Sequence, residues 1–292
     1  MRSFFVFLVP ILFLIPGSIM TESMNASIDV KIIQTKTMKE VSWKEILDEM
    51  DKNEILIWGE EHDDSFGHIA QLEFYKKFSD LYPTSLSLEM LEKDQQPILD
   101  EYSRGSIPEK QLLSSLVLWK NFFSDYLPLL KHAKESYHPI ICANPPRRYV
   151  NAIARKGMIA YSEFSEDAYK LIPPAYTLGL YQSEPYLAKL RAMFQEDHTS
   201  PSKQNISSES MILAQYMWDQ GMADAISRES YRSGRKVIHF NGRFHSDAMG
   251  GVAYRLSQMG HKVLVLSVFP EGKEEVQNFE KLADFVILTK SR

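Results

Sequence analysis

The sequence contains very little cysteine and no excess of basic residues. Cys142 is the single cysteine among 292 residues, which excludes an intrachain disulfide and leaves too few thiols for a structural zinc site built on thiolates. The 33 lysines and arginines are outnumbered by 38 acidic residues, giving a net charge of −5. We therefore expect no nucleic-acid partner, because proteins that bind nucleic acids concentrate positive charge on their surface. With 44% hydrophobic residues, 13 glycines and 14 prolines, the composition is that of a globular protein rather than a disordered or collagen-like chain.

An uncharged apolar run occupies residues 4–15 and follows Arg2. The run is too short for a typical membrane span, which needs about 20 residues. It is typical of a secretory signal peptide, which we expect over residues 1–23, with an uncleaved anchor as the alternative. Residues 21–27 contain no cysteine, so lipid attachment through an N-terminal cysteine is excluded. We expect an exported protein, either periplasmic or in the cell envelope.

Short apolar runs alternate with helical patterns along the rest of the chain. Such continuous runs predict strands that are covered on both faces of a sheet. We expect strands at 55–58, 85–88, 140–143, 237–240, 263–268 and 283–288, and helices at 66–80, 109–120, 125–136, 208–230 and 247–259. Alternating strands and helices predict an α/β fold with a central, largely parallel sheet flanked by helices. We expect one domain over residues 28–292, with a helical insertion over about 100–136.

Polar residues follow four of the predicted strands at the point where each strand ends. They are Gly59, Glu60, Glu61 and His62 after the first, Glu89 after the second, Asn144 and Arg147 after the third, and Gly242, Arg243 and His245 after the fourth. In an open α/β sheet, ligands bind outside the carboxyl ends of the strands. The sequence therefore predicts a functional site at this edge of the sheet.

Two of these strand ends share the pattern Gly-x-x-His, at Gly59 to His62 and at Gly242 to His245. Glycine allows a tight exit from a strand, after which the histidine can turn back over the sheet edge. Histidine with glutamate suits metal binding and also general acid–base chemistry. The candidate metal ligands are His62, Glu89 and His245, and His68 lies close enough in sequence to approach the same place.

Each of these residues also has a purely structural explanation. For each histidine, the structural alternative is a helix cap or a packed, hydrogen-bonded position. For Glu60 and Glu61, it is a solvated pair at a helix entry, and Glu60 fits this better than Glu61. Glu89 follows a buried strand, where an unpaired carboxylate is costly. Arg147 is a candidate ion-pair partner for Glu89, in which case both would be structural. Asp219 has the features of an ordinary surface helix residue.

Seven motifs in order resemble the ChaN-like haem-binding family of the Tiki and erythromycin-esterase superfamily, over roughly residues 50–290. They are Gly59-Glu60-Glu61-His62-Asp63 with His68 and Gln71, Ser87-Leu88-Glu89-Met90, residues 95–100, Trp119 with Tyr126, Ala143-Asn144-Pro145-Pro146-Arg147, residues 215–223, and Gly242-Arg243-Phe244-His245 followed by Gly250 and Gly251. Two departures are the absence of a lipidation cysteine and Ala253, where relatives commonly have proline.

The resemblance implies an extracytoplasmic protein linked to iron acquisition, with haem held between the subunits of a homodimer and a tyrosine as iron ligand. Tyr126 and Tyr181 are the candidate tyrosines, and an outer-membrane haem receptor is a possible partner. The superfamily also includes metalloproteases and esterases, which implies chemistry at Glu61, His62, Glu89 and His245.

Two functions are therefore expected. The first is haem binding for haem or iron uptake, with haem as the cofactor. Its candidate contacts are His62, His68, Asn144, Arg147, His245, Tyr126 and Tyr181. The alternative is a hydrolase of ester or peptide bonds that depends on a divalent metal and uses Glu61, His62, Glu89 and His245. Whether the chain is an enzyme stays open at this point.

Overall fold

A computed structural model of the chain describes residues 30–196, 207–272 and 279–290. The predicted signal peptide, residues 1–23, lies outside these ranges. Within them, no helix has both the length and the apolar character that a membrane crossing requires.

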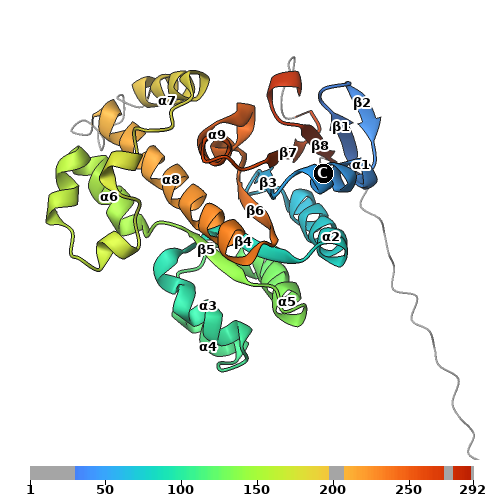
Figure 1. Cartoon of the computed structure of the whole chain (residues 1–292), viewed down its shortest axis with the longest axis horizontal. Coiled ribbons are helices and arrows are strands. Elements are labelled where there is room, and N and C mark those ends of the chain that lie inside the picture. The colour runs from blue at the N-terminus through green and yellow to red at the C-terminus, as the bar shows by residue number, and fades with distance from the viewer. Residues whose placement is uncertain (1–29, 197–206, 273–278, 291–292) are drawn as a thin grey trace, which may run out of the picture.

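The described strands form one eight-stranded sheet in the order β2-β1-β8-β7-β3-β6-β4-β5 (Figure 1). The strands are β1 (Lys31–Gln34), β2 (Lys39–Val41), β3 (Ile55–Glu60), β4 (Thr84–Glu92), β5 (Ile140–Asn144), β6 (Lys236–Gly242), β7 (Val263–Pro270) and β8 (Phe285–Thr289). Strands β3 to β8 are parallel to one another, whereas β1 is antiparallel to both β8 and β2. The predicted α/β fold with a largely parallel sheet is confirmed.

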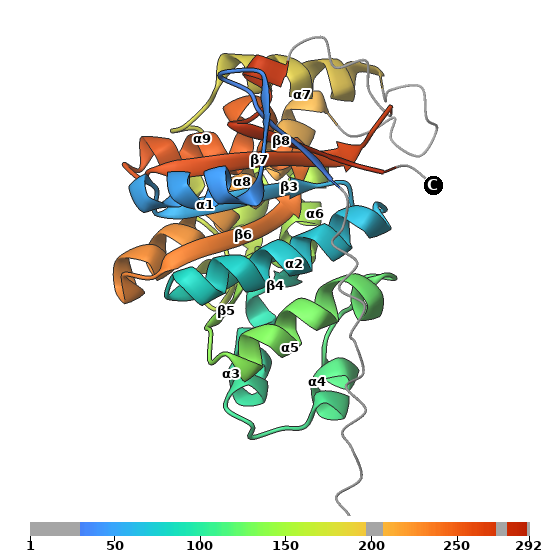
Figure 2. The same cartoon turned by 90° about the vertical axis from the view of Figure 1, so that its right-hand side faces the viewer.

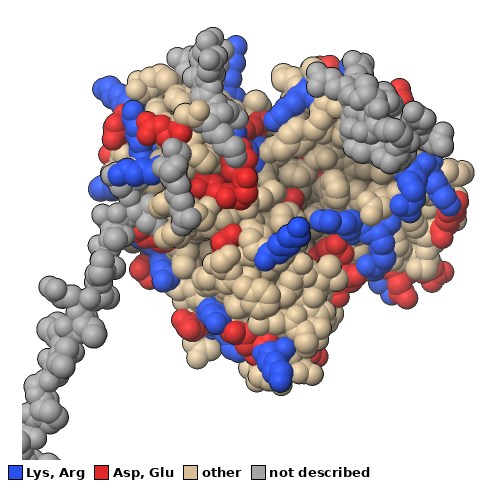
Figure 3. All heavy atoms as spheres, turned by 180° about the vertical axis from the view of Figure 1, so that it is seen from behind, with Lys and Arg blue, Asp and Glu red and all other residues tan. Residues whose placement is uncertain are grey.

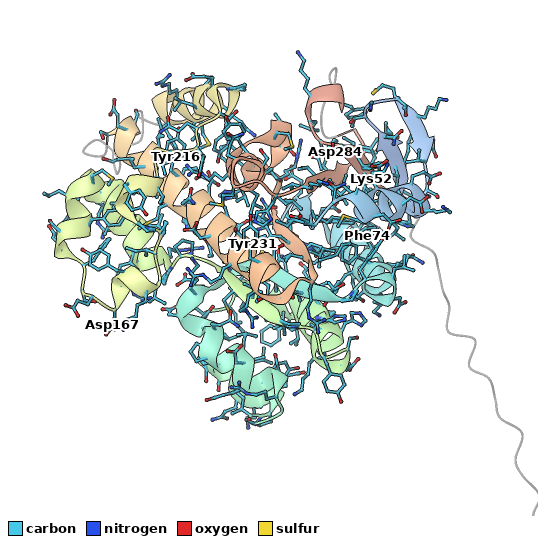
Figure 4. The ribbon with its side chains drawn as sticks, viewed as in Figure 1. Lys52, Phe74, Asp167, Tyr216, Tyr231 and Asp284 are labelled. Atoms are coloured by element: carbon cyan, nitrogen blue, oxygen red, sulfur yellow. The ribbon has the colours of Figure 1, made fainter. Side chains whose placement is uncertain are left out.

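Helices cover both faces of the sheet (Figure 2). On one face, α1 (Trp43–Glu49), α2 (Ser65–Leu81) and α5 (Leu127–Glu135) pack on Leu56 and Trp58. On the other, α8 (Ser208–Ser233) and α9 (Gly251–Gln258) pack on Ile55 and Ile57. Successive side chains of a strand point to opposite faces, so a strand buried on both sides has the continuous apolar sequence seen in β3. Figure 4 shows Phe74 of α2 in the first of these layers.

Helices also fill the connection between β4 and β5. They are η2 (Lys93–Gln95), α3 (Gln96–Ser103), α4 (Glu109–Ser115) and the π-helical turn η3 (Phe122–Tyr126), which leads into α5. The helix expected over 109–120 ends earlier, because Leu116 has an extended backbone with φ −94° and ψ 149°. Residues 117–119 are therefore free of the helix and reach the carboxyl-end side of the sheet.

A second group of helices packs on α8 and was not predicted from the sequence. Residues 147–180, which we name the α6 lobe, contain α6 (Arg147–Lys156) and the 3-10 turns η4 (Gly157–Glu163), η5 (Ala168–Lys170) and η6 (Ala175–Thr177). The lobe is followed by α7 (Glu184–Glu196), and both share an apolar cluster with α8. The further short turns are η1 (Met50–Lys52), η9 (Arg243–His245), η10 (Asp247–Met249) and η11 (Phe279–Lys281).

The edge strand β5 is closed by a side chain rather than by another strand. The amide of Gln96 donates to the carbonyl of Ile140 at 2.7 Å and accepts the N–H of Cys142 at 2.8 Å. One side-chain amide thus takes the hydrogen-bonding place of a neighbouring strand. This protects part of an edge that would otherwise pair with another chain.

Candidate functional site

The carboxyl ends of β3, β6 and β4 lie side by side. They bring together four of the polar residues that were predicted to follow the strands, Glu60, His62, Glu89 and His245. Glu60 of β3 lies opposite Gly242 of β6 in the parallel register, and β4 becomes irregular between Leu88 and Glu92, where it carries Glu89. Figure 3 shows this face of the molecule, which is hollowed near its middle and has acidic and basic side chains around the hollow. The sequence-based prediction that polar strand ends converge here therefore matches their placement.

Glu60 and His62 form a carboxylate–imidazole pair in which the carboxylate is buried. His62 Nδ1 donates to Glu60 Oε1 at 2.9 Å, and the hydroxyl of Tyr126 and the amide of Gln71 donate to the same carboxylate at 2.5 Å each. Burial acts to raise the pKa of Glu60, but the His62 hydrogen bond and the charge of His68 outweigh it, so the pKa is lowered. Glu60 is therefore held as a carboxylate.

The His62 ring keeps 39% of its side-chain surface exposed. Burial acts to lower its pKa, but Glu60 and Glu89 outweigh burial and raise it. The ring also contacts Trp119 edge to face, with 4.8 Å between the ring centroids. Because Nδ1 donates to a carboxylate, Nε2 carries the lone pair in the neutral ring.

The two Gly-x-x-His glycines are required by close packing. A Cβ at Gly242 would lie 2.6 Å from His62 Nε2, and a Cβ at Gly59 would lie 3.0 Å from the Cα of Arg243. Neither glycine is among those with a positive φ, so the space available to a side chain, and not a left-handed backbone, is what favours glycine here. Each glycine instead makes room for the turn that follows the neighbouring strand.

His245 lies between two carboxylates at the end of β6. Its Nδ1 is 2.6 Å from Asp219 Oδ1 of α8, and its Nε2 is 3.6 Å from Glu89 Oε1. Burial acts to lower the pKa of His245, but the charges of Glu89 and Asp219 raise it to about 8. The hydroxyl of Tyr186 donates to the other oxygen of Asp219 at 2.9 Å, which fixes the orientation of the carboxylate.

Glu89 has different partners from the one suggested by its sequence. It accepts the backbone N–H of Gly242 at 2.7 Å and faces His245. No Glu89–Arg147 ion pair is present within the described ranges, and Arg147 is exposed. The alternative in which these two residues are merely a structural pair is therefore not supported.

The roles expected for Glu60 and Glu61 are reversed in the structure. Glu60 is buried at the centre of the site, whereas Glu61 is 28% exposed and forms an ion pair with Arg243 at 3.1 Å. Arg243 also binds Asp247 at 2.8 Å. The strand period explains the difference, because Glu60 points to the same face as Trp58 and so lies beneath α2 and the π-helical turn.

His68 lies behind the pair rather than in the hollow. It is buried, with Nε2 at 3.1 Å from the carbonyl oxygen of His62 and 3.5 Å from Asp125 Oδ2. Its Nδ1 is 3.8 Å from Glu60. His68 therefore supports the His62 segment and the charge of Glu60.

At least two cavities formed by the described residues open on this face. One, of about 460 Å³, is lined by Glu89, Asn144, Arg147, Lys120, Trp119 and Val117, among others. The other, of about 300 Å³, is lined by Glu60, Glu61, His62, Lys189, Arg243 and Phe244, among others. Asn144 is buried, and its side-chain oxygen has no hydrogen-bond partner among the residues that the structure describes. A ligand or water with a hydrogen-bond donor would satisfy this atom.

Comparison with known proteins identifies the family. Residues 46–256 match the family described as haem-binding uptake, Tiki superfamily, ChaN. The chain belongs to the ChaN family. No curated protein matches it significantly in sequence.

A solved structure of a ChaN protein has the same fold, and two weaker matches accompany it. The structure of cofacial haem binding to ChaN of Campylobacter jejuni superposes with a TM-score of 0.68 at 20% identity, covering 90% of this chain and 98% of that one. The type III effector HopBA1 gives 0.47 at 13% identity, with 92% and 100% covered. A mutant of the erythromycin esterase EreC in its open conformation gives 0.43 at 11% identity, with 90% and 83% covered. The last two likenesses are too weak to bear on function.

The two tyrosines nominated as haem ligands lie in different surroundings in this ChaN-family chain. Tyr126 has no exposed surface, and its hydroxyl is bound to Glu60. Burial and the charge of Glu60 raise the pKa of Tyr126, which disfavours a phenolate. Tyr181 is half-buried in the connection before α7 and makes none of the contacts given above for the strand-end residues.

His62, Glu89 and His245 do not form the expected metal group. Across the described ranges, no three histidine, cysteine or acidic side chains are placed to hold one metal ion. The reason is that His245 is already bound between Asp219 and Glu89, while His62 is turned toward Glu60. A shared ion would require these side chains to leave their present partners.

Two functional candidates were missed from the sequence. Asp219 lies 26 residues before His245 and was taken for a surface residue, although it is buried. Glu60 was considered mainly as a solvated residue. A usable signal for Asp219 was its position in the middle of an apolar helical stretch beside Met217 and Met222, where a solitary carboxylate needs a partner.

Proposed function

We propose that the chain binds haem at the 460 Å³ cavity on the carboxyl-end face and serves haem or iron uptake outside the cytoplasm. Membership of the ChaN family carries this proposal. The export signal expected over residues 1–23 supports the location.

The residues around the cavity suit haem. Trp119 lines it, and Val117 and Phe123 in the same connection are 74% and 59% exposed. Apolar and aromatic walls with a few polar groups are typical of cofactor sites. Arg147 and Lys120 supply positive charge for the propionates.

His62 lines the neighbouring 300 Å³ cavity and contacts Trp119, which lines the 460 Å³ cavity. It is the side chain of this face best suited to bind the iron of a haem that extends from the larger cavity to the smaller one. His62 is partly exposed, and its Nδ1 donates to Glu60, which leaves Nε2 as the ligating nitrogen. A carboxylate behind a ligating histidine is a common arrangement that fixes the tautomer and raises the basicity of the ligand. A tyrosine ligand, as the family resemblance implies, would then complete the iron coordination.

A visible absorption titration of the chain with haemin tests this function, with the metal content measured beforehand. We expect a saturable Soret shift, and a weaker affinity, by about tenfold or more, for Trp119→Ala and for Arg147→Glu. His62→Ala is expected to change the position of the Soret band. Lys52→Met is the control, because Lys52 is exposed and lies before the amino end of β3, whereas the cavity lies at the carboxyl ends of the strands. Absence of a Soret shift in the unmodified chain would contradict the proposal.

We also propose a second candidate, a hydrolase of ester or peptide bonds. The observation that favours it is the Asp219–His245–Glu89 arrangement, which holds an imidazole between two carboxylates. A histidine whose pKa is about 8 is suited to donate a proton near neutral pH. A haem carrier has no evident need for this group.

Screening with chromogenic esters and short peptides, with added Zn²⁺ or Mn²⁺ and with a chelator, tests the second candidate. We expect turnover that falls by about a hundredfold in His245→Ala, while Lys52→Met remains active. Turnover unchanged in both His62→Ala and His245→Ala would exclude hydrolysis at this site.

A further inference from the structure

A further cavity, of about 820 Å³, lies beside the edge strand β5 and is separate from the strand-end site. Its walls come from η2, α3, the beginning of β5, η5 in the α6 lobe and the C-terminal half of α8. Figure 1 shows the lobe to the left of β5 and α3 below it, with α8 running obliquely beside β5. Asp167 marks the lobe in Figure 4, and Tyr231 marks the end of α8. We name this hollow the β5 cavity.

The β5 cavity is suited to a small molecule rather than to an added strand. The backbone groups of Ile140 and Cys142 that face it are already bound by the side chain of Gln96. An incoming peptide strand would have to displace this amide. The volume lies within the range of about 300–1,000 Å³ found for small-molecule sites.

Positive charge exceeds negative charge in the lining. Five cations, Lys93, Arg104, Lys170, Arg228 and Arg232, accompany three carboxylates, Asp100, Asp224 and Glu229. Arg232 is bound to Glu229 at 2.5 Å, and Lys170 to Asp167 at 2.7 Å. Glu229 is further satisfied by the hydroxyl of Ser85 at 2.8 Å.

The other three cations, Lys93, Arg104 and Arg228, have no ion pair within 4.0 Å in the described part of the chain. Of these, Lys93 and Arg228 act on each other and on the single carboxylate of Asp224. Burial and, to a smaller extent, the charge of Arg228 lower the pKa of Lys93 to about 8 against the opposing effect of Asp224. An additional anionic group would relieve this repulsion.

Much of the rest of the wall is apolar. Ile141 comes from the strand, and Leu171, Ile172 and Pro174 come from the lobe. A ligand with only a charged group would leave this surface uncovered. A hydrocarbon or ring attached to the charged group would bury it and gain about 25 cal/mol for each Å² removed from water.

We propose that the β5 cavity binds an amphipathic organic anion, whose carboxylate or phosphate is held by Lys93 and Arg228 and whose apolar part packs against Ile141 and Ile172. This site does not depend on the proposed haem function, because the two cavities share no residue.

Isothermal titration calorimetry of the full chain with octanoate and with octyl phosphate tests the site and separates the two anion types. We expect saturable binding of at least one, and binding weaker by about tenfold or more for octanol, which lacks the charge, and for inorganic phosphate, which lacks the apolar part. Equal binding of octanol and the two anions would overturn the proposal.

Lys93→Met and Arg228→Met are each expected to weaken the binding of the anion by about tenfold. Arg228 is exposed, so its replacement tests the site without disturbing the core. Lys52→Met is the matched control for loss of one lysine, and circular dichroism checks that every variant is folded. Unchanged affinity in Arg228→Met and Lys93→Met, or no saturable binding of either anion, would overturn the proposal.

Haemin is itself an organic anion, so the same variants are also titrated with haemin. We expect Lys93→Met to keep the Soret shift of the unmodified chain. Loss of the shift in Lys93→Met alone would assign haem to this cavity and overturn the inference of a separate site. Loss of haemin binding in Trp119→Ala, with binding of the organic anion retained, would separate the two functions.

Discussion

His245 illustrates how two buried carboxylates control a titration. Asp219 and Glu89 raise the pKa of His245 from its ordinary 6.5 to about 8, a difference that corresponds to about 2 kcal/mol. Because the pKa in the folded chain lies above that in the unfolded chain, this stabilisation is fully present below pH 6.5. It is lost as the pH rises through about 8.

We therefore expect Asp219→Asn to lower the pKa of His245. The variant should also lose about 1 kcal/mol more unfolding free energy at about pH 6 than at about pH 9. NMR titration of the histidine ring signals and urea unfolding at the two pH values measure these effects. Asp48→Asn, at an exposed ion pair with Lys44, should show neither change. An unshifted His245 titration in Asp219→Asn would show that Asp219 does not set this pKa.

Gly242 is the residue at which a single methyl group has the greatest expected effect on His62. The Cβ of an alanine would lie 2.6 Å from His62 Nε2, so the imidazole has to leave its place over β6. We expect Gly242→Ala to weaken the His62–Glu60 pair and to cost about 1–3 kcal/mol of unfolding free energy. Chemical denaturation and the His62 NMR signal measure this.

Gly179→Ala is the matched control for Gly242→Ala. Its added Cβ would meet only the flexible Gln182 amide, at 3.4 Å. A Gly242→Ala variant as stable as Gly179→Ala, with an unmoved His62 signal, would refute the close-packing explanation of the Gly-x-x-His pattern.

At the scale of elements, the central strands could be predicted because their sequences are determined by burial alone. Strands β3, β6 and β7 carry mostly apolar residues on both faces, with the buried His239 of β6 as an exception, so their identity follows from sequence. The short antiparallel β1 and β2 and the polar α6 could not be predicted in the same way, because tertiary contacts stabilise them. The roles of Glu60 and Asp219 were missed for a related reason. Their partners, Tyr126 and His245, lie 66 and 26 residues away in sequence.

The closure of β5 by Gln96 leads to a prediction at the same scale. Gln96→Ala leaves the Ile140 carbonyl and the Cys142 N–H without this partner, and an unmade hydrogen bond of a buried group costs about 1–3 kcal/mol. We expect lower stability in urea and more light scattering at high protein concentration, because an open edge pairs with other chains. Gln111→Ala, at an exposed position of α4, is the control, and equal behaviour of the two variants would show that Gln96 does not protect the edge.

At the scale of the whole molecule, the exposed residues beside the proposed haem cavity bear on assembly. Val117 and Phe123 are 74% and 59% exposed and lie in the connection that contributes Val117 and Trp119 to the cavity. Large apolar side chains at the rim of a ligand site are typical of surfaces that become covered. The family resemblance implies a homodimer with haem between its subunits, and this rim is where a second chain would cover the haem.

We therefore expect haemin to shift the chain from monomer to dimer, measured by sedimentation velocity at matched protein concentration. The double variant Val117→Ser with Phe123→Ser should keep the fold of the free chain, since both residues are exposed, but should lose most of the haemin-induced dimer. Replacing Ile159, which is 64% exposed in the α6 lobe, by serine is the control for removal of an exposed apolar residue elsewhere. The dimer should then depend on haemin and on the rim together. Burying two apolar side chains on each subunit contributes only a few kcal/mol, which does not hold two chains together unless the haem also bridges them. A haemin-induced dimer of unchanged stability in the double variant would place the interface on another face of the molecule.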